Sequence, residues 1–176
     1  LINGATGTSG GLAVRIARHL GAGKIIATGR NRAVLEQLRT QGADIILTLD
    51  ELPGALPALM QQGIDVVLDY LWGQSALDIM HAAVAGGEKT VRFVQIGSLS
   101  GQEIALHSKL LRSSGLTLMG SGLGSVSDSE LIACIGEMLN AAAESDFSIA
   151  FQQRPLSEVE QAWQQDDSLC RTVFTL

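Results

Sequence analysis

Cysteine is scarce in this chain of 176 residues, and its scarcity excludes two classes of small protein. Only Cys134 and Cys170 occur. They are too few and too far apart for a disulfide framework or for a zinc lobe built on paired cysteines. We interpret each as a small apolar residue that is buried or half-buried. With 46% hydrophobic residues, the chain can bury a core without such cross-links, as one domain with at most a short appendage.

Positive charge and long apolar runs are also lacking. The 12 Lys and Arg residues stand against 18 Asp and Glu, which leaves a net charge of -6. A chain of this charge has no general basic surface for phosphate, so no nucleic-acid partner is expected. No apolar run approaches the roughly 18 to 20 residues of a membrane span, and no signal-peptide pattern opens the chain. We therefore expect no membrane partner and a cytoplasmic location.

Metal-binding and hydrolytic patterns are missing as well. His19, His81 and His107 have no Cys, Asp or Glu partner at the spacing of metal ligands, so no metal site is predicted. The segment 97–101 superficially resembles the nucleophile elbow of hydrolases, but its central residue is Leu99 and not serine. Because no set of acid, base and nucleophile is found, no catalytic residue is predicted, and we expect little or no turnover from this chain alone.

Short aliphatic runs alternate with longer segments of helical period, a pattern that predicts an α/β fold with a parallel sheet. Six strands are expected at residues 1–3, 24–28, 44–47, 64–69, 91–96 and 116–119. Helices are expected at residues 10–20, 32–40, 56–62, 75–85 and 128–142, the last with Ser127 or Asp128 as N-cap. The prediction is a Rossmann fold, that is, a doubly wound six-stranded parallel sheet with helices on both faces, over residues 1–145.

The two ends of the chain depart from this alternation. Residues 146–176 predict a short tail of strand, helix and strand, with a strand at 147–154, a helix that starts at Pro155 and a closing strand at 172–176. Leu1 and Ile2 are the only apolar residues before a glycine-rich turn, whereas a buried strand usually runs about five or six residues. We therefore expect the first strand to be truncated, as in a piece of a larger protein.

A glycine-rich loop at residues 3–11 lies between the first strand and the first helix. Its glycines, Gly4, Gly7 and Gly10, are spaced G-x-x-G-x-x-G, and Thr6 stands where the dinucleotide-binding pattern G-x-G-x-x-G has a glycine. Such a loop allows a tight turn and places a pyrophosphate on the helix N-terminus, where free N–H groups and the helix dipole favour an anion. The alternative is an ordinary glycine-rich turn. The predicted cofactor-binding residues of this loop are Gly4, Thr6, Gly7, Thr8, Ser9 and Gly10.

The end of the second strand predicts which dinucleotide is bound. In NAD-specific domains an acid about 20 residues after the loop binds the ribose 2′-hydroxyl, and this chain has none there. Two arginines and an amide stand in its place, and the planar fork of arginine suits a phosphate. The alternative is that the arginines are solvated charges. The sequence therefore predicts NADP(H), held here by Thr28, Gly29, Arg30, Asn31 and Arg32.

The ends of two later strands are further candidates, because ligands of open parallel sheets lie outside the carboxyl ends of the strands. After the fourth strand, Asp69 is expected to cap the turn that follows, while Tyr70 and Leu71 border the cofactor. Trp72 either joins them or packs on another domain. After the fifth strand, Gly97 and Ser98 are expected near the nicotinamide half.

In these features the chain resembles the medium-chain dehydrogenase/reductase superfamily, in its branch similar to zinc-type alcohol dehydrogenases and quinone oxidoreductases. The resemblance covers essentially the whole chain. It is based on the order of these motifs: Gly4-Ala5-Thr6-Gly7, Ala13-Val14 with Ile16-Ala17, Gly42-Ala43-Asp44, residues 64–69, residues 155–163 and residues 171–174.

This resemblance implies the nucleotide-binding part of a two-domain enzyme, whose GroES-like catalytic domain precedes it and is rejoined by the tail. Such enzymes transfer a hydride between NADPH and a small-molecule substrate, a quinone, enone, aldehyde or alcohol. Any zinc ligands would lie in the preceding part. Members also form homodimers through an edge strand of the sheet, here residues 116–119.

Three alternatives remain open on the sequence. An atypical short-chain dehydrogenase also begins with a glycine-rich loop, but Tyr70, the only tyrosine, is followed four residues later by Gln74 and not by the catalytic lysine of that family. A redox sensor that binds NADP(H) without turnover is the second, and a scaffold with degraded affinity for nucleotide is the third.

Overall fold

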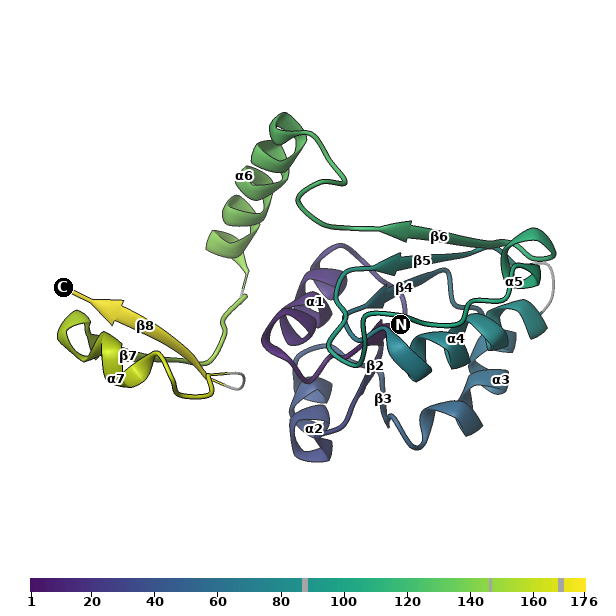
Figure 1. Ribbon diagram of the computed structural model, residues 1–176, viewed down its shortest axis with the longest axis horizontal. Coiled ribbons are helices and arrows are strands. Elements are labelled where there is room, and N and C mark those ends of the chain that lie inside the picture. Colours follow the sequence, from purple (N-terminus) through teal and green to yellow (C-terminus); the bar gives the residue numbers. More distant parts are fainter. Residues whose placement is uncertain (87–88, 146, 168–169) are drawn as a thin grey trace.

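The computed structural model describes residues 1–86, 89–145, 147–167 and 170–176. Its main feature is a six-stranded parallel sheet in the order β3-β2-β1-β4-β5-β6 (Figure 1). The strands are β1 (Ile2–Asn3), β2 (Ile26–Gly29), β3 (Ile45–Thr48), β4 (Val66–Asp69), β5 (Val91–Gln95) and β6 (Leu116–Gly120). The order reverses between β1 and β4, which is the topological switch point of a Rossmann fold, and the predicted fold class is confirmed.

The helices largely follow the predicted periodicity and differ at their ends. They are α1 (Thr8–His19), α2 (Arg32–Thr40), α3 (Leu52–Gln62), α4 (Gly73–Ala85), α5 (Lys109–Arg112) and α6 (Asp128–Glu144). Helix α3 starts at Leu52 and not at residue 56, because Pro53 lies in the first turn, where its missing N–H has no partner to lose. The one-turn helix α5 was not expected, since so short a helix has no measurable period.

Two hydrophobic clusters hold the sheet between pairs of helices. Helices α1 and α2 contribute Val14, Leu35 and Leu38 to one cluster, together with residues of β1, β2 and β3. Helices α3 and α4 contribute residues such as Leu56 and Ile79 to the other, which extends across β4, β5 and β6. The cluster of α1 and α2 thus covers one face of the sheet along β1, β2 and β3, and the cluster of α3 and α4 covers the other face, whereas Arg92, Thr117 and Met119 of β5 and β6 are exposed.

Helix α6 stands apart from the sheet (Figure 1), and none of its residues is buried. It is stabilised locally by a capping box, in which the Ser127 hydroxyl accepts from the Glu130 N–H and the Glu130 carboxylate accepts from the Ser127 N–H. Cys134 is exposed on this helix, so the interpretation of that cysteine as buried or half-buried is wrong. The helix displays exposed apolar side chains at Ile132, Ile135, Met138 and Leu139.

The tail forms its own small parallel sheet. It consists of β7 (Phe151–Pro155), the 3-10 turn η1 (Leu156–Glu158), the short helix α7 (Val159–Ala162) and β8 (Arg171–Thr175), and so confirms the predicted strand, helix and strand. Pro155 ends β7 and does not begin a helix. Residue 146, where the predicted tail starts, lies outside the described residues.

The strand predicted at residues 147–154 begins only at Phe151, because residues 147–150 lie against α1. The ring of Phe147 meets the ring of His19 edge-on, with centroids 5.3 Å apart. The Arg15 guanidinium donates to the Ser148 hydroxyl at 3.1 Å. His19 also contacts the Ser145 hydroxyl at 3.0 Å. In the described part of the chain, no helix combines the length and the apolar character that crossing a membrane requires.

Candidate functional site

The glycine loop joins β1 to α1 in a conformation that only small residues allow. Gly4 has a φ of +91°, in the region that favours glycine. The loop is tied to the end of β2, since the N–H groups of Gly4 and Ala5 both donate to the Thr28 carbonyl, at 3.1 and 2.7 Å. The loop and the second strand end are therefore held as one unit.

The N-terminus of α1 is suited to an anion. Gly7 is its N-cap, and among the described residues no side chain caps this helix and no acid lies in its first turn. Gly10 packs so closely on the loop that a Cβ there would lie 2.8 Å from the Ala5 Cα and would collide with the Gly4 carbonyl oxygen. This close contact between helix and strand is what the third glycine of a dinucleotide-binding loop provides.

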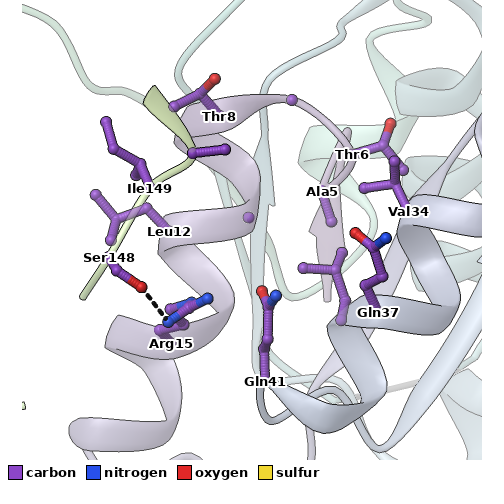
Figure 2. Close-up of a pocket in the computed structure, with 14 residues that line it drawn as sticks. Ala5, Thr6, Thr8, Leu12, Arg15, Val34, Gln37, Gln41, Ser148 and Ile149 are labelled. Carbon is purple, nitrogen blue, oxygen red and sulfur yellow. Dashed lines mark hydrogen bonds between the residues drawn. The ribbon is translucent and has the colours of Figure 1, made fainter. Parts of the chain in front are cut away.

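A cavity of about 340 Å³ opens beneath the loop, between α1 and α2 (Figure 2). Thr6 and Thr8 lie toward the loop, and Arg15 and Gln41 lie at the other end. Gly7 also lines it, whereas Gly4, Ser9 and Gly10 do not. Three of the six predicted loop residues therefore face this cavity.

The predicted phosphate-binding residues lie together at the end of β2, but they differ in whether their side chains already have partners within the chain. The Asn31 side chain caps α2 by accepting from the Val34 N–H at 3.2 Å. The Arg32 guanidinium is paired with the carboxylates of Glu36 and Glu51. Arg30 is exposed and forms no ion pair within the described ranges. Of the two arginines, Arg30 is therefore the one available to a ligand.

Glu51 is a residue of this cluster that sequence reasoning missed. It lies in the turn after β3, and its carboxylate accepts from the Thr48 N–H at 2.8 Å. This hydrogen bond and the adjacent Arg32 guanidinium hold the pKa of Glu51 below its ordinary value. The rule that locates the ribose-binding acid considers only residues that follow the second strand along the chain. Glu51 instead follows the neighbouring third strand. The strand order typical of a Rossmann fold, in which the third strand lies beside the second, was the signal that could have found it.

A buried polar network connects the ends of the three central strands. The Asn3 amide donates to the Asp69 carboxylate at 2.8 Å and accepts from the Thr28 hydroxyl at 2.8 Å. All three side chains are fully buried. Asp69 also accepts from the N–H groups of Leu71 and Trp72, which confirms its predicted capping role. Burial raises the pKa of Asp69 in spite of these hydrogen bonds.

The turn after β4 contacts the glycine loop through Tyr70 and Leu71, which are predicted to border the cofactor. A Cβ on Gly4 would lie 2.8 Å from the Leu71 Cγ and 3.3 Å from the Tyr70 Cβ. Burial raises the pKa of the Tyr70 hydroxyl. Trp72 has φ 59° and ψ -153°, a backbone conformation that is unfavourable for any residue other than glycine. The hydrogen bond from the Trp72 N–H to the Asp69 carboxylate stabilises it. Its ring meets that of Phe93 edge-on.

A second cavity of about 440 Å³ lies at the carboxyl ends of β4, β5 and β6. Ser98 lines it, and Gly97 approaches the Tyr70 carbonyl so closely that a Cβ would lie 2.7 Å from that oxygen. The lining residues are all uncharged: Trp72, Gln95, Ser98, Gln102, Leu118, Met119 and Gly120. In the described residues, no group of three or more His, Cys, Asp or Glu side chains is placed to hold a metal ion.

The chain matches a known protein family over most of its length. The family profile described as zinc-binding dehydrogenase matches residues 10–141. The chain is 30% identical over 183 aligned residues to a protein of Emericella nidulans named "probable NADPH-dependent quinone reductase tdiC", with 96% of this chain and 51% of that protein covered. The chain thus spans about half the length of this relative.

Solved structures share the fold over nearly the whole chain. The Bacillus subtilis protein yhfP with NAD bound superposes with a TM-score of 0.74 at 20% identity, covering 99% of this chain and 53% of its own. The complex of Etr1p with NADP and crotonyl-CoA superposes with a TM-score of 0.77 at 18% identity, with the same coverage. The family match, the strand order and the glycine loop agree. The chain belongs to the zinc-binding dehydrogenase family of the medium-chain dehydrogenase/reductase superfamily, as its C-terminal, nucleotide-binding domain.

Proposed function

We propose that this chain is the NADP(H)-binding domain of an oxidoreductase that transfers a hydride between NADPH and a quinone, enone, aldehyde or alcohol. The observation that carries the preference for NADP(H) is Arg30. Arg30 is exposed directly after β2, whose last residue, Gly29, packs against Thr6 of the glycine loop, and no acid follows that strand directly. A guanidinium in this place would bind the 2′-phosphate, which is the only group that distinguishes NADP(H) from NAD(H).

The two halves of the cofactor would occupy opposite sides of the switch point. The pyrophosphate would lie on the N-terminus of α1, held by the loop residues, because this helix end carries no competing acid. The nicotinamide half would extend toward Ser98 and the uncharged cavity after β4, β5 and β6. When bound, the cofactor supplies the hydride, and the residues of this chain bind and orient it.

The rest of the enzyme is part of the same proposal. The acceptor would be bound between this domain and a catalytic domain that precedes it, and the exposed apolar residues of α6 suit a surface covered in the whole protein. Strand β6 forms one edge of the sheet, so it could pair with the same strand of a second copy in a homodimer. Turnover of a quinone, enone or aldehyde with NADPH by the full-length protein would separate this function from that of a sensor that only binds NADPH.

Replacing Arg30 with alanine is expected to weaken NADPH binding by the full-length protein about 10- to 100-fold, while NADH binding changes less than about twofold. A hydrogen-bonded charge pair of this kind is worth about 1.5 to 3 kcal/mol, and 1.4 kcal/mol corresponds to a factor of ten in affinity. Dissociation constants for both nucleotides, measured by quenching of protein fluorescence, check the result.

The matched control is Arg39→Ala, which removes the same charge from an ion pair with Glu36 in the last turn of α2. This variant should keep the wild-type preference for NADPH. An equal loss of NADPH affinity in both variants would mean that net charge, and not a contact of Arg30, sets the preference. Equal binding of NADPH and NADH by the wild type would refute the proposed cofactor.

A further inference from the structure

The ion pair between Arg32 and Glu51 lies inside the predicted phosphate site. The Arg32 Nη1 contacts both oxygens of the Glu51 carboxylate, each at 3.1 Å. The Nε of the same guanidinium donates to Glu36 at 3.0 Å. The Nε and Nη1 groups of Arg32 are therefore both occupied by carboxylates of this chain. Arg30, two residues earlier, has no such partner in the described residues.

Glu51 is held in this place by the backbone and not by Arg32 alone. Gly29 at the end of β2 is the register partner of Thr48 at the end of β3, and the Leu49 N–H donates to the Gly29 carbonyl at 3.1 Å. The Glu51 carboxylate in turn accepts from the Thr48 N–H at 2.8 Å. The sheet thus brings a fixed negative charge to the strand end that carries the arginines.

We propose that Glu51 is a specificity-determining residue, which limits the preference for NADPH by occupying Arg32 and by repelling the 2′-phosphate. This inference rests on the proposed function, because it concerns the same phosphate site. A phosphate that approaches this site must displace the carboxylate from Arg32 or bind through Arg30 alone. A repulsive group beside an attractive one is a general means of setting specificity. The site therefore discriminates against NADH less strongly than its two arginines would by themselves.

The competition is realistic because the pair is only partly buried. The side chains of Arg32 and Glu51 are 50% and 47% exposed, and such ion pairs contribute little to stability. Replacing Glu51 therefore alters the charge at the site without endangering the fold. Glutamine is the suitable replacement, since its amide oxygen can still accept from the Thr48 N–H.

In the full-length protein, Glu51→Gln is expected to tighten NADPH binding about three- to tenfold and to leave NADH binding within twofold of the wild type. The probe pair of 2′,5′-ADP and 5′-AMP should show the same difference, because only the first carries the 2′-phosphate. Dissociation constants measured by calorimetry at fixed ionic strength check both pairs, since salt screens exposed charges.

Two further variants show whether the effect passes through Arg32. Asp50→Asn removes the same charge from the neighbouring residue, which makes no ion pair in the described part of the chain, and should change NADPH affinity less than twofold. In the double variant Arg32→Ala with Glu51→Gln, most of the gain should be lost. An equal gain from Asp50→Asn would overturn the assignment of Glu51, and a gain that persists in full without Arg32 would overturn its action through Arg32.

The failure of this inference can be told apart from the failure of the proposed function. If the wild type prefers NADPH and Arg30→Ala removes that preference, while Glu51→Gln changes nothing, the cofactor proposal stands and the role of Glu51 is refuted. If the wild type binds 2′,5′-ADP no better than 5′-AMP, and no variant creates a preference, both are refuted.

Discussion

Replacing Gly10 with alanine is expected to lower nucleotide affinity at least 100-fold and to lower the free energy of unfolding by about 2 to 3 kcal/mol, the upper part of the range for overpacked sites. The added Cβ would lie 2.8 Å from the Ala5 Cα and 2.9 Å from the Gly4 carbonyl carbon. These are backbone atoms, which cannot rotate away as a side chain can. The loop must therefore move off α1, and the anion-binding N–H groups move with it.

Gly11→Ala is the matched control, because Gly11 is the next residue of the same helix. A Cβ there would meet the Ala5 carbonyl oxygen at 3.5 Å and Leu38 at 3.7 Å, which are ordinary contacts. Since alanine favours a helix over glycine by about 0.5 to 1 kcal/mol, this variant should be as stable as the wild type or more so. Thermal unfolding with and without NADPH measures both effects. Similar behaviour of the two variants would contradict the close packing of Gly10.

The sequence predicts most of the fold because its signals are local and repeat. Short aliphatic runs specify the six strands, and the glycine loop marks the switch point between β1 and β4. Helix α6 shows where such signals stop. Its capping box specifies a helix that begins at Asp128, but nothing in its periodicity states that no residue of it would be buried against the sheet.

The candidate site shows the same division between neighbours along the chain and neighbours in space. Arg30 and Asn31 are found from the sequence because they follow a strand at a known distance from the glycine loop. Glu51 is not found from the sequence, because it reaches the end of β2 from the neighbouring strand β3. The network of the Asn3 amide is not found either, because the partners of this amide come from β2 and β4. Contacts between strands depend on the sheet order, which spacing rules do not use.

Asp69 is expected to be the polar residue whose loss costs most. Replacing it with alanine leaves the N–H groups of Leu71 and Trp72 without their acceptor and removes one partner of the Asn3 amide, and the Asp69 and Asn3 side chains are fully buried. Each unsatisfied buried group costs about 1 to 3 kcal/mol, so a loss of about 3 to 5 kcal/mol is expected. Chemical denaturation of the full-length protein measures it.

The same substitution should weaken NADPH binding more than tenfold, because Asp69 holds the turn that contacts the glycine loop. Asp78→Asn is the control, since the Asp78 carboxylate lies on α4 and accepts only from the exposed Gln74 amide at 2.8 Å among the contacts that the structure describes. That variant should change stability by less than about 0.5 kcal/mol and leave nucleotide binding intact. A stable Asp69→Ala variant with normal affinity would show that the network does not position the loop.

The pH dependence of Asp69→Asn tests the buried state of this carboxyl. Burial raises the pKa of Asp69 in the folded protein above its ordinary value of 3.8. At a pH between 3.8 and this raised pKa, the folded protein therefore binds a proton more readily than the unfolded chain does. The contribution of Asp69 to stability therefore falls as the pH rises through that range, opposite to that of Glu51, whose pKa is lowered. The stability difference between wild type and Asp69→Asn should accordingly shrink from about pH 4 upward. A difference that grows with pH would mean that hydrogen bonds from Asn3, Leu71 and Trp72 outweigh desolvation at this site.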